Sequence, residues 1–361
     1  MSLPRALMIV AAAALASSAV AAPAVAQRAV STGANASSYS WRVTATGSTD
    51  EFRGLAAVSR DVAWVSGEQG TVLRTTNRGA TWENVSPPAA AGRALRDIEA
   101  FSANDAVTLS IGKGRQSRIF STTDGGSTWQ EVFRNVDPAA FYDCMAFTRD
   151  GTGLALSDPV NGYFRLARST NFGKTWRVQS TKGMPPALTN EFAFAASGTC
   201  IISGPVHRFW FATGGTRPRV FASSDGGRHW TVTRTPIRGG ASAGIYSIDF
   251  RDPRHGVVVG GDYTDETNGA RAAAHTVNAG RTWTLSQRQV GGYRSGVSYV
   301  PRAPHTVIAV GPTGSDVSSN GGKTWTGFDT ARYDGVQCAS DGGCWASGTD
   351  GRVAVLLRPR P

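Results

Sequence analysis

One eight-residue motif recurs six times in this sequence and constrains its fold more than any other feature. It has the form Ser/Thr-x-Asp/Asn-x-Gly-x-x-Trp, and its tryptophans are Trp82, Trp129, Trp176, Trp230, Trp283 and Trp325. Successive tryptophans lie 47, 47, 54, 53 and 42 residues apart. A period of roughly 40 to 50 residues built from short strands is typical of a β-propeller, in which each repeat supplies one four-stranded blade.

The segments between the motifs have the pattern of strands. Residues 55–58 form an apolar run, residues 63–67 resemble a second strand that ends in glycine, and residues 70–76 lead into the first motif. Alternation and β-branched or aromatic residues recur in this way along the chain, and no long helical period competes. The sequence therefore predicts an all-β protein.

The motif has a physical purpose in a hairpin. The Asp or Asn oxygen can accept a hydrogen bond from the backbone two residues on, the glycine supplies a positive φ, and the tryptophan anchors the turn. Four of the six motifs carry asparagine, at Asn77, Asn171, Asn278 and Asn320. Because asparagine carries no charge, we expect neither catalysis nor Ca²⁺ binding at these turns. No cofactor and no metal are expected.

The ends of the chain predict a seventh blade. After the sixth motif, residues 334–338, 344–347 and 352–357 supply three more strands, and the chain then stops. Residues 40–43 resemble the strand that follows each motif, such as residues 175–178. We expect this N-terminal strand to complete the C-terminal blade, because closing the ring removes exposed sheet edges. The predicted propeller spans residues 39–357, between a flexible segment at 27–38 and a tail at 358–361.

The N-terminus predicts export. Arg5 is followed by an apolar run at residues 6–16 and by Ala24-Val25-Ala26 before Gln27. This order is typical of a signal peptide comprising residues 1–26, with an uncleaved membrane anchor as the alternative. We therefore expect a periplasmic or secreted protein, with no transmembrane segment after cleavage.

The positive charge is carried almost entirely by arginine. The chain has 37 Lys and Arg against 26 Asp and Glu, a net charge of +11, and loss of Arg5 with the signal peptide makes it +10. The planar guanidinium group of arginine suits carboxylate and phosphate ligands. The simpler interpretation is that the arginines are dispersed over the surface and only keep the protein soluble. Without a basic run, no nucleic-acid partner is expected.

Four cysteines fall into two groups. Cys338 and Cys344 flank a turn-rich string between two strand-like segments, which predicts a hairpin disulfide in an oxidising compartment. Cys144 and Cys200 each lie in an apolar run, and we interpret them as buried free thiols. No Cys or His lies at ligand spacing from another, which disfavours a metal site.

The six motifs resemble those of the Asp-box (BNR) propellers, a class that includes sialidases, sortilin-like receptors and photosystem II stability and assembly factors. The resemblance covers nearly all of residues 39–357. Residues 52–55, 63–67 and 70–76 look most like bacterial relatives of the assembly factors. That resemblance implies a scaffold that binds polypeptide during assembly of a complex, here an envelope complex, with no indication of its client.

In each blade, the start of the innermost strand and the loop between the second and third strands lie on the face opposite the motif turns. We expect the side chains at these positions to meet at one mouth of the channel. We expect a monomer that binds a protein, a peptide or a small acidic ligand at this mouth. Salt bridges that merely line a wet channel are the competing interpretation. The predicted ligand-binding residues are Arg53, Arg96, Tyr142, Glu191, Arg208, Tyr246, Asp262 and Arg294.

A sialidase-like glycoside hydrolase is the alternative function. Arg53, Arg96 and Arg294 would imitate the sialidase arginine triad, with Tyr246 or Tyr142 and Glu191 as the nucleophile pair and Asp97 as the acid. Two departures count against it: sialidases have six blades, and their Phe-Arg-Ile-Pro start is Phe-Arg-Gly-Leu here. No Gly-x-Gly-x-x-Gly motif supports a dinucleotide oxidoreductase. We therefore expect binding without catalysis.

Overall fold

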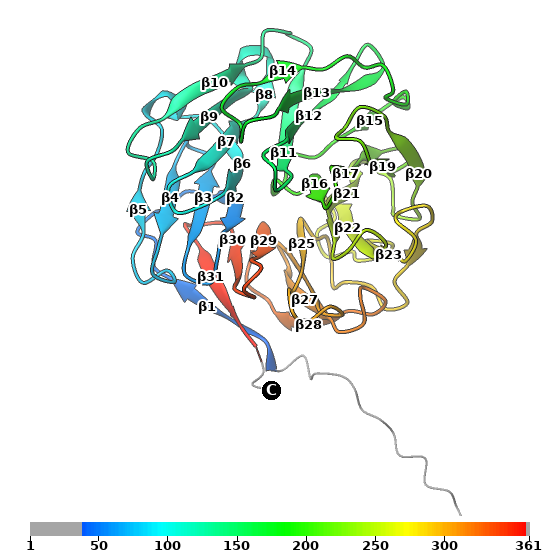
Figure 1. Cartoon of the computed structure of the whole chain (residues 1–361). Coiled ribbons are helices and arrows are strands. Elements are labelled where there is room, and N and C mark those ends of the chain that lie inside the picture. Colours follow the sequence, from blue (N-terminus) through cyan, green and yellow to red (C-terminus); the bar gives the residue numbers. More distant parts are fainter. Residues whose placement is uncertain (1–37, 359–361) are drawn as a thin grey trace, which may run out of the picture. The chain divides into compact units, whose positions relative to one another are not determined.

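The computed structural model describes residues 38–358, which form seven β-sheets arranged in a ring (Figure 1). The predicted seven-bladed β-propeller is confirmed. The predicted signal peptide, residues 27–37 and residues 359–361 lie outside the described residues. No helix within residues 38–358 combines the length and the apolar character needed to span a membrane.

In blades 1 to 6, four antiparallel strands run in chain order from the channel to the rim. Blade 1 contains β2 (Phe52–Ala57), β3 (Ala63–Gly67), β4 (Val72–Thr75) and β5 (Glu83–Asn84). Blade 2 contains β6 (Leu95–Ala100), β7 (Ala106–Ser110), β9 (Arg118–Thr122) and β10 (Gln130–Arg134). Blade 3 contains β11 (Phe141–Phe147), β12 (Gly153–Val160), β13 (Tyr163–Ser169) and β14 (Arg177–Val178), with β8 (Gly112–Lys113) paired to β11.

Blade 4 contains β16 (Ile201–Gly204), β17 (Arg208–Ala212), β19 (Arg219–Ser223) and β20 (Thr231–Arg234). Blade 5 contains β21 (Gly240–Phe250), β22 (Gly256–Asp262), β23 (Ala273–Thr276) and β24 (Thr284–Leu285), extended by β15 (Glu191–Phe192) and β18 (Gly214–Gly215). Blade 6 contains β25 (Gly296–Tyr299), β26 (Val307–Gly311), β27 (Gly314–Ser318) and β28 (Thr326–Asp329). Two short 3-10 helices, η2 (Pro88–Ala90) and η3 (Gly114–Gln116), lie in connections.

Blade 7 joins the two ends of the described chain. Its strands are β29 (Gly335–Cys338), β30 (Cys344–Ser347), β31 (Val353–Leu357) and, outermost, β1 (Ser40–Thr44). The pairing runs from Ser40 opposite Leu357 to Thr44 opposite Val353, and Figure 1 shows the blue β1 beside the red β31. The predicted closure by the N-terminal strand is confirmed, so the ring has no unfinished blade edge.

The core lies mainly between neighbouring blades. Between blades 3 and 4, for example, Leu154 and Phe164 pack in one buried cluster with Phe209, Phe211 and Phe221. Each fully buried side chain of this size contributes about 1.5 to 3 kcal/mol relative to an exposed one. The ring is therefore held together chiefly by apolar contact between blade faces.

All six motifs form the same turn. The hydroxyl of the first Ser or Thr accepts a hydrogen bond from the glycine amide at 2.9 to 3.1 Å. The Asp or Asn oxygen accepts from the backbone four residues on at 2.9 to 3.0 Å, rather than two residues on as the sequence suggested. The six glycines have φ of 73° to 86°, as predicted. The hydroxyl of the first Ser or Thr, for which no role was predicted, therefore closes the turn.

These motif turns define one face of the ring. Each turn donates a backbone N–H to the loop between the first two strands of its own blade, as from Gly125 to the Asn104 carbonyl at 2.9 Å and from Gly226 to the His207 carbonyl at 2.8 Å. We call this side the motif face. The loops between second and third strands, and the links between blades, lie on the opposite side, the mouth face.

Two disulfides cross-link the described chain. Cys338 and Cys344 are bonded across the β29–β30 hairpin. Cys144 and Cys200 are also bonded, with their Cα atoms 6.1 Å apart, so the prediction of two free thiols is wrong. Cys144 lies in β11 of blade 3 and Cys200 directly precedes β16 of blade 4. Packing of adjacent blades thus pairs cysteines that are 56 residues apart in sequence.

Candidate functional site

The central channel is blocked by a segment of the chain itself. Residues 193–199, which we call the plug, run between β15 and β16 and are buried along most of their length. The Phe194 ring stacks on Tyr246 of blade 5 with centroids 3.6 Å apart. The Ser197 hydroxyl donates to the Ser295 carbonyl beside blade 6 at 2.7 Å. The plug therefore lies between two recesses, one open to each face.

The recess on the mouth face, the mouth recess, has a volume of about 430 Å³. Arg53 in β2 and Arg96 in β6 line it together with the plug. Arg96 donates to the Ala195 carbonyl at 2.9 Å, and Arg53 lies 3.5 Å from the Ala196 carbonyl. Two guanidinium groups from neighbouring blades thus contact consecutive carbonyls of the plug.

Acidic side chains neutralise both arginines. Arg53 forms ion pairs with Glu51, Glu68 and Asp334 at 2.5, 3.0 and 3.2 Å, and Arg96 pairs with Glu68 at 2.7 Å. Burial raises the pKa of Asp334 to about 6. The local charge is therefore not strongly positive, which favours the salt-bridge interpretation of this channel over a simple anion clamp.

Tyrosines form the other wall of the mouth recess. Tyr246 and Tyr293 pack edge to face at 4.7 Å, and the Tyr246 hydroxyl donates to the Ser242 carbonyl at 2.6 Å. Tyr263 stays 52 % exposed at the opening. Of the predicted ligand-binding residues, this recess brings together Arg53, Arg96 and Tyr246. Asp262 lies nearby on the mouth face, where it accepts from Ser242 at 2.7 Å.

Three predicted ligand-binding residues are instead buried in the framework. Arg294 forms an ion pair with Asp316 at 2.6 Å, with both side chains at most 3 % exposed. Glu191 forms a buried ion pair with Arg219. Tyr142 is fully buried between blades 2 and 3, where it packs against Phe133. The prediction that these three side chains lie at an open mouth is wrong, because each of them is buried inside the propeller.

Arg208 lies on the other side of the ring from its predicted position. It begins β17, directly after His207, whose carbonyl accepts from a motif turn. Glu191 was expected from sequence to begin the innermost strand of blade 4, whereas that strand is β16. Because the expected strand order was offset by one strand, Arg208 was expected in the loop between the second and third strands, on the mouth face. It instead begins the second strand, on the motif face.

The structure does not assemble the sialidase-like constellation. Arg294 is separated from the other two arginines by its own buried ion pair, and Glu191 pairs with Arg219 instead of a tyrosine. Asp97, the predicted acid, is 3 % exposed and accepts from the Met145 amide at 2.5 Å. Burial, and then the neighbouring Glu99, raise the pKa of Asp97.

Polar side chains that line the channel have a structural role. Each innermost strand would otherwise leave unpaired amides along its channel edge. At five positions a side chain accepts from an amide of the next blade at 2.5 to 3.2 Å. The acceptors are Asp97, Ser247, Asp249, Ser298 and Gln337, and the amides belong to Met145, Val297, Tyr299, Cys338 and Ala57 respectively.

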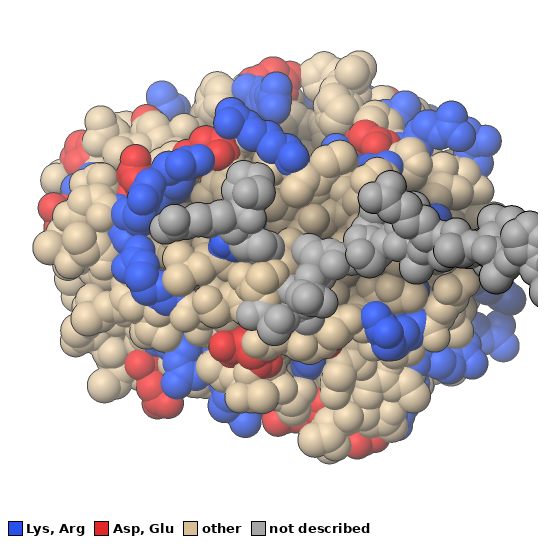
Figure 2. Space-filling model, turned by 90° about the horizontal axis from the view of Figure 1, so that it is seen from below, with Lys and Arg blue, Asp and Glu red and all other residues tan. Residues whose placement is uncertain are grey.

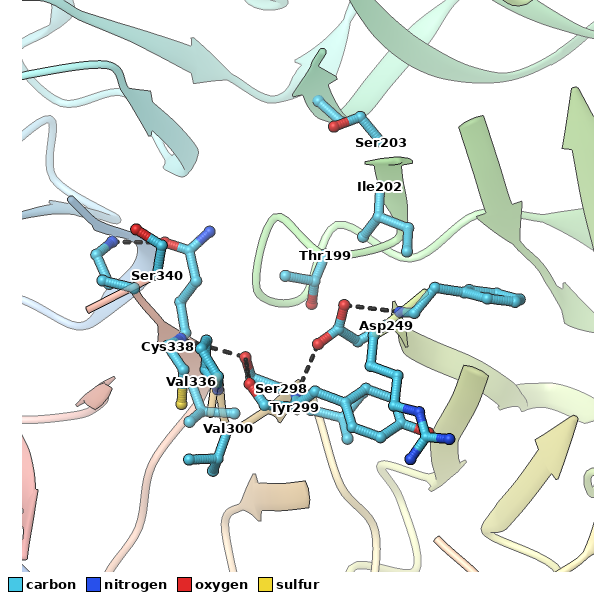
Figure 3. Close-up of a pocket in the computed structure, with 18 of the residues that line it drawn as sticks. Thr199, Ile202, Ser203, Asp249, Ser298, Tyr299, Val300, Val336, Cys338 and Ser340 are labelled. Carbon is cyan, nitrogen blue, oxygen red and sulfur yellow. Dashed lines mark hydrogen bonds between the residues drawn. The ribbon is translucent and has the colours of Figure 1, made fainter. Parts of the chain in front are cut away.

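The recess on the motif face, which we call the bowl, is larger, at about 900 Å³ (Figure 3). Figure 3 shows Thr199 of the plug, Ile202 and Ser203 of β16 and Ser298 and Tyr299 of β25 around this space. Neither the plug nor the bowl was predicted from the sequence. The only available signal was the interval of 54 residues before Trp230, which exceeds the two preceding intervals of 47 and accommodates the plug.

Within residues 38–358, His, Cys, Asp and Glu side chains form no group of three or more that could hold a metal ion. Lysines and arginines are interspersed with acidic side chains on the rim seen in Figure 2.

Comparison with known proteins identifies the fold. No protein-family model and no curated protein match this chain. A solved structure described as YCF48 bound to D1 peptide is 14 % identical with a TM-score of 0.61, and the match covers 89 % of this chain and 97 % of that one. YCF48 from Cyanidioschyzon merolae is 18 % identical, with a TM-score of 0.58 and coverage of 88 % and 99 %. A structure of U3-55K is 11 % identical, with a TM-score of 0.61 and coverage of 88 % and 98 %. At these identities the likeness establishes the propeller fold.

Proposed function

We propose that this chain is an exported scaffold that binds a peptide segment of a protein partner at its mouth recess, in the assembly or stability of an envelope complex. The observation that carries the proposal is the contact of Arg53 and Arg96 with two consecutive plug carbonyls. Guanidinium groups that already donate to backbone carbonyls of this chain are the kind of donor that also suits a carbonyl of a bound peptide.

The exposed Tyr263 adds an anchor for such a segment. Aromatic side chains with a polar tip contribute strongly to protein interfaces, because they bury a large area at little entropic cost. Tyr263 and Tyr246 pack edge to face at 6.5 Å, so the exposed ring continues the aromatic wall of the recess. The similar fold of YCF48 bound to D1 peptide supports peptide binding by a propeller of this kind.

Export is supported by the two disulfides, since disulfides persist in oxidising compartments. Protease accessibility in intact and osmotically shocked cells tests it. Digestion only after lysis of the inner membrane would contradict export.

Site-specific photo-crosslinking tests the mouth. Benzoylphenylalanine in place of Tyr263 should capture a discrete polypeptide in the native host, identified by mass spectrometry. The same probe in place of Val206, which is 81 % exposed on the motif face, should not capture it. A synthetic peptide from the captured region should then bind the pure protein, and Tyr263→Ser should weaken it about 5- to 30-fold. Equal capture from both positions, or no loss of affinity in Tyr263→Ser, would refute binding at the mouth.

A further inference from the structure

The bowl has unsatisfied donors at its rim. Arg149 follows β11 in blade 3 and Arg302 follows β25 in blade 6, and both are exposed. Neither forms an ion pair within the described part of the chain, in contrast to Arg53 and Arg96 at the mouth. The Gln337 side chain uses its oxygen to accept from the Ala57 amide, which leaves its amide nitrogen free to donate.

An aromatic belt lies in the wall of the bowl. Phe101 and Phe147 pack edge to face at 5.0 Å, and Phe250 and Tyr299 contribute further apolar surface to the same recess. Outside the bowl, Phe172 extends this belt at 5.1 Å from Phe101 and is 41 % exposed. Such a surface offers burial to an aromatic or branched side chain of a ligand.

The acids deeper in the bowl do not oppose an anion strongly. Burial raises the pKa of Glu99 to about 8, so this carboxyl holds its proton at neutral pH. Asp249 lies against the amides of Phe250 and Tyr299 at 2.7 and 2.6 Å, which occupy its oxygens. At the rim, Asp252 is paired with Arg251 at 3.1 Å.

From these features we infer that the bowl is a second binding site, which takes an acidic peptide segment with aromatic or branched apolar side chains from a partner protein. The carboxylates contact Arg149 and Arg302 by charge complementarity, and the apolar side chains pack on the aromatic belt. Since the two arginines belong to blades 3 and 6, which are not neighbours, a ligand that contacts both must span the opening. A peptide does so, whereas a small anion would occupy a single guanidinium group.

Fluorescence anisotropy with two labelled hexapeptides tests this inference. The acidic peptide is Glu-Phe-Asp-Leu-Glu-Phe, and its counterpart replaces every acidic residue by lysine. The acidic peptide should bind at least 10-fold more tightly than the basic one. The double variant Arg149→Gln/Arg302→Gln should lose at least 10-fold in affinity, whereas Arg177→Gln, an exposed arginine on the outer strand β14, should bind like the parent.

The outcomes separate this inference from the proposed function. Equal binding of the two peptides, no binding of either, or full affinity in the double variant would overturn the bowl site. If Tyr263→Ser abolished binding while the double variant retained it, the peptide would bind at the mouth recess, and the bowl inference alone would fail. Unchanged circular dichroism and melting temperature of the double variant would show that its fold is intact.

Discussion

Replacement of Arg294 by alanine separates a framework role from a ligand-binding role for this side chain. Arg294 donates through Nε to Asp316 at 2.6 Å and through Nη1 to Thr313 and the Tyr293 carbonyl at 2.8 and 2.9 Å. The side chains of Arg294 and Asp316 are only 3 % and 2 % exposed. Arg294→Ala would leave a buried carboxylate without its cation, which costs about 3 to 5 kcal/mol. The Gly291 amide still donates to Asp316 at 3.2 Å, so we expect a value near the lower end.

The assay is urea unfolding followed by tryptophan fluorescence. Arg294→Ala should lower the free energy of unfolding by about 3 kcal/mol, whereas Arg294→Met/Asp316→Leu should recover most of it because no unpaired charge remains. Arg177→Ala, on the exposed outer strand β14, should change it by less than about 0.5 kcal/mol. If Arg294→Ala left stability unchanged yet weakened binding of an acidic peptide, the ion pair would be no part of the framework and the mouth role predicted from sequence would return.

Three further predictions concern the turns, the channel and the disulfides. Trp129→Ala should lower the free energy of unfolding by about 3 kcal/mol in the same assay, because the ring packs against Trp64 and its N–H donates to a carbonyl at 2.7 Å. Because Glu99 has a pKa raised to about 8, the folded protein retains a proton that the unfolded chain releases near pH 4.5, and stability falls as pH rises between these values. The gain in melting temperature from Glu99→Gln should therefore grow from pH 5 to pH 8.5 in calorimetry, and a constant difference would contradict this. Replacing Cys144 and Cys200 by alanine should lower the free energy of unfolding by about 4 kcal/mol, since this disulfide joins residues 56 apart. Removing the short hairpin disulfide should lower it by about 2 kcal/mol. Unfolding midpoints measure both changes.

Sequence reasoning predicted the ring well because the relevant signals are local. Each motif turn is closed by side chains and amides within seven residues of one another, as in Thr75 to Thr81, so the pattern survives in the linear sequence. The strand at residues 40–43 was recognisable because it repeats the composition of other outer strands. Both kinds of signal require no knowledge of distant neighbours.

The site was predicted poorly because it depends on distant partners. Arg53, Arg96 and Arg294 begin their innermost strands in the same way, yet only Arg294 lies against Asp316, 22 residues further along the chain, in a buried pair. The apolar run at residues 193–196 has the composition of an inner strand, and only packing shows that it crosses the channel instead. Local composition does not distinguish a side chain that faces solvent from one that a neighbouring blade covers.

The pairing of β1 with β31 also has a kinetic consequence. Joining Ser40 to Leu357 closes a loop of almost the whole chain, which costs about 3 kcal/mol more entropy than closing a ten-residue hairpin. During synthesis, β1 therefore remains unpaired until β31 has emerged from the ribosome. Six blades can form in order behind it, but the circle closes only at the end, as a single late step. Folding of this protein should thus be limited by one long-range docking event, and truncation of β31 alone should leave the earlier blades assembled in an open, aggregation-prone arc.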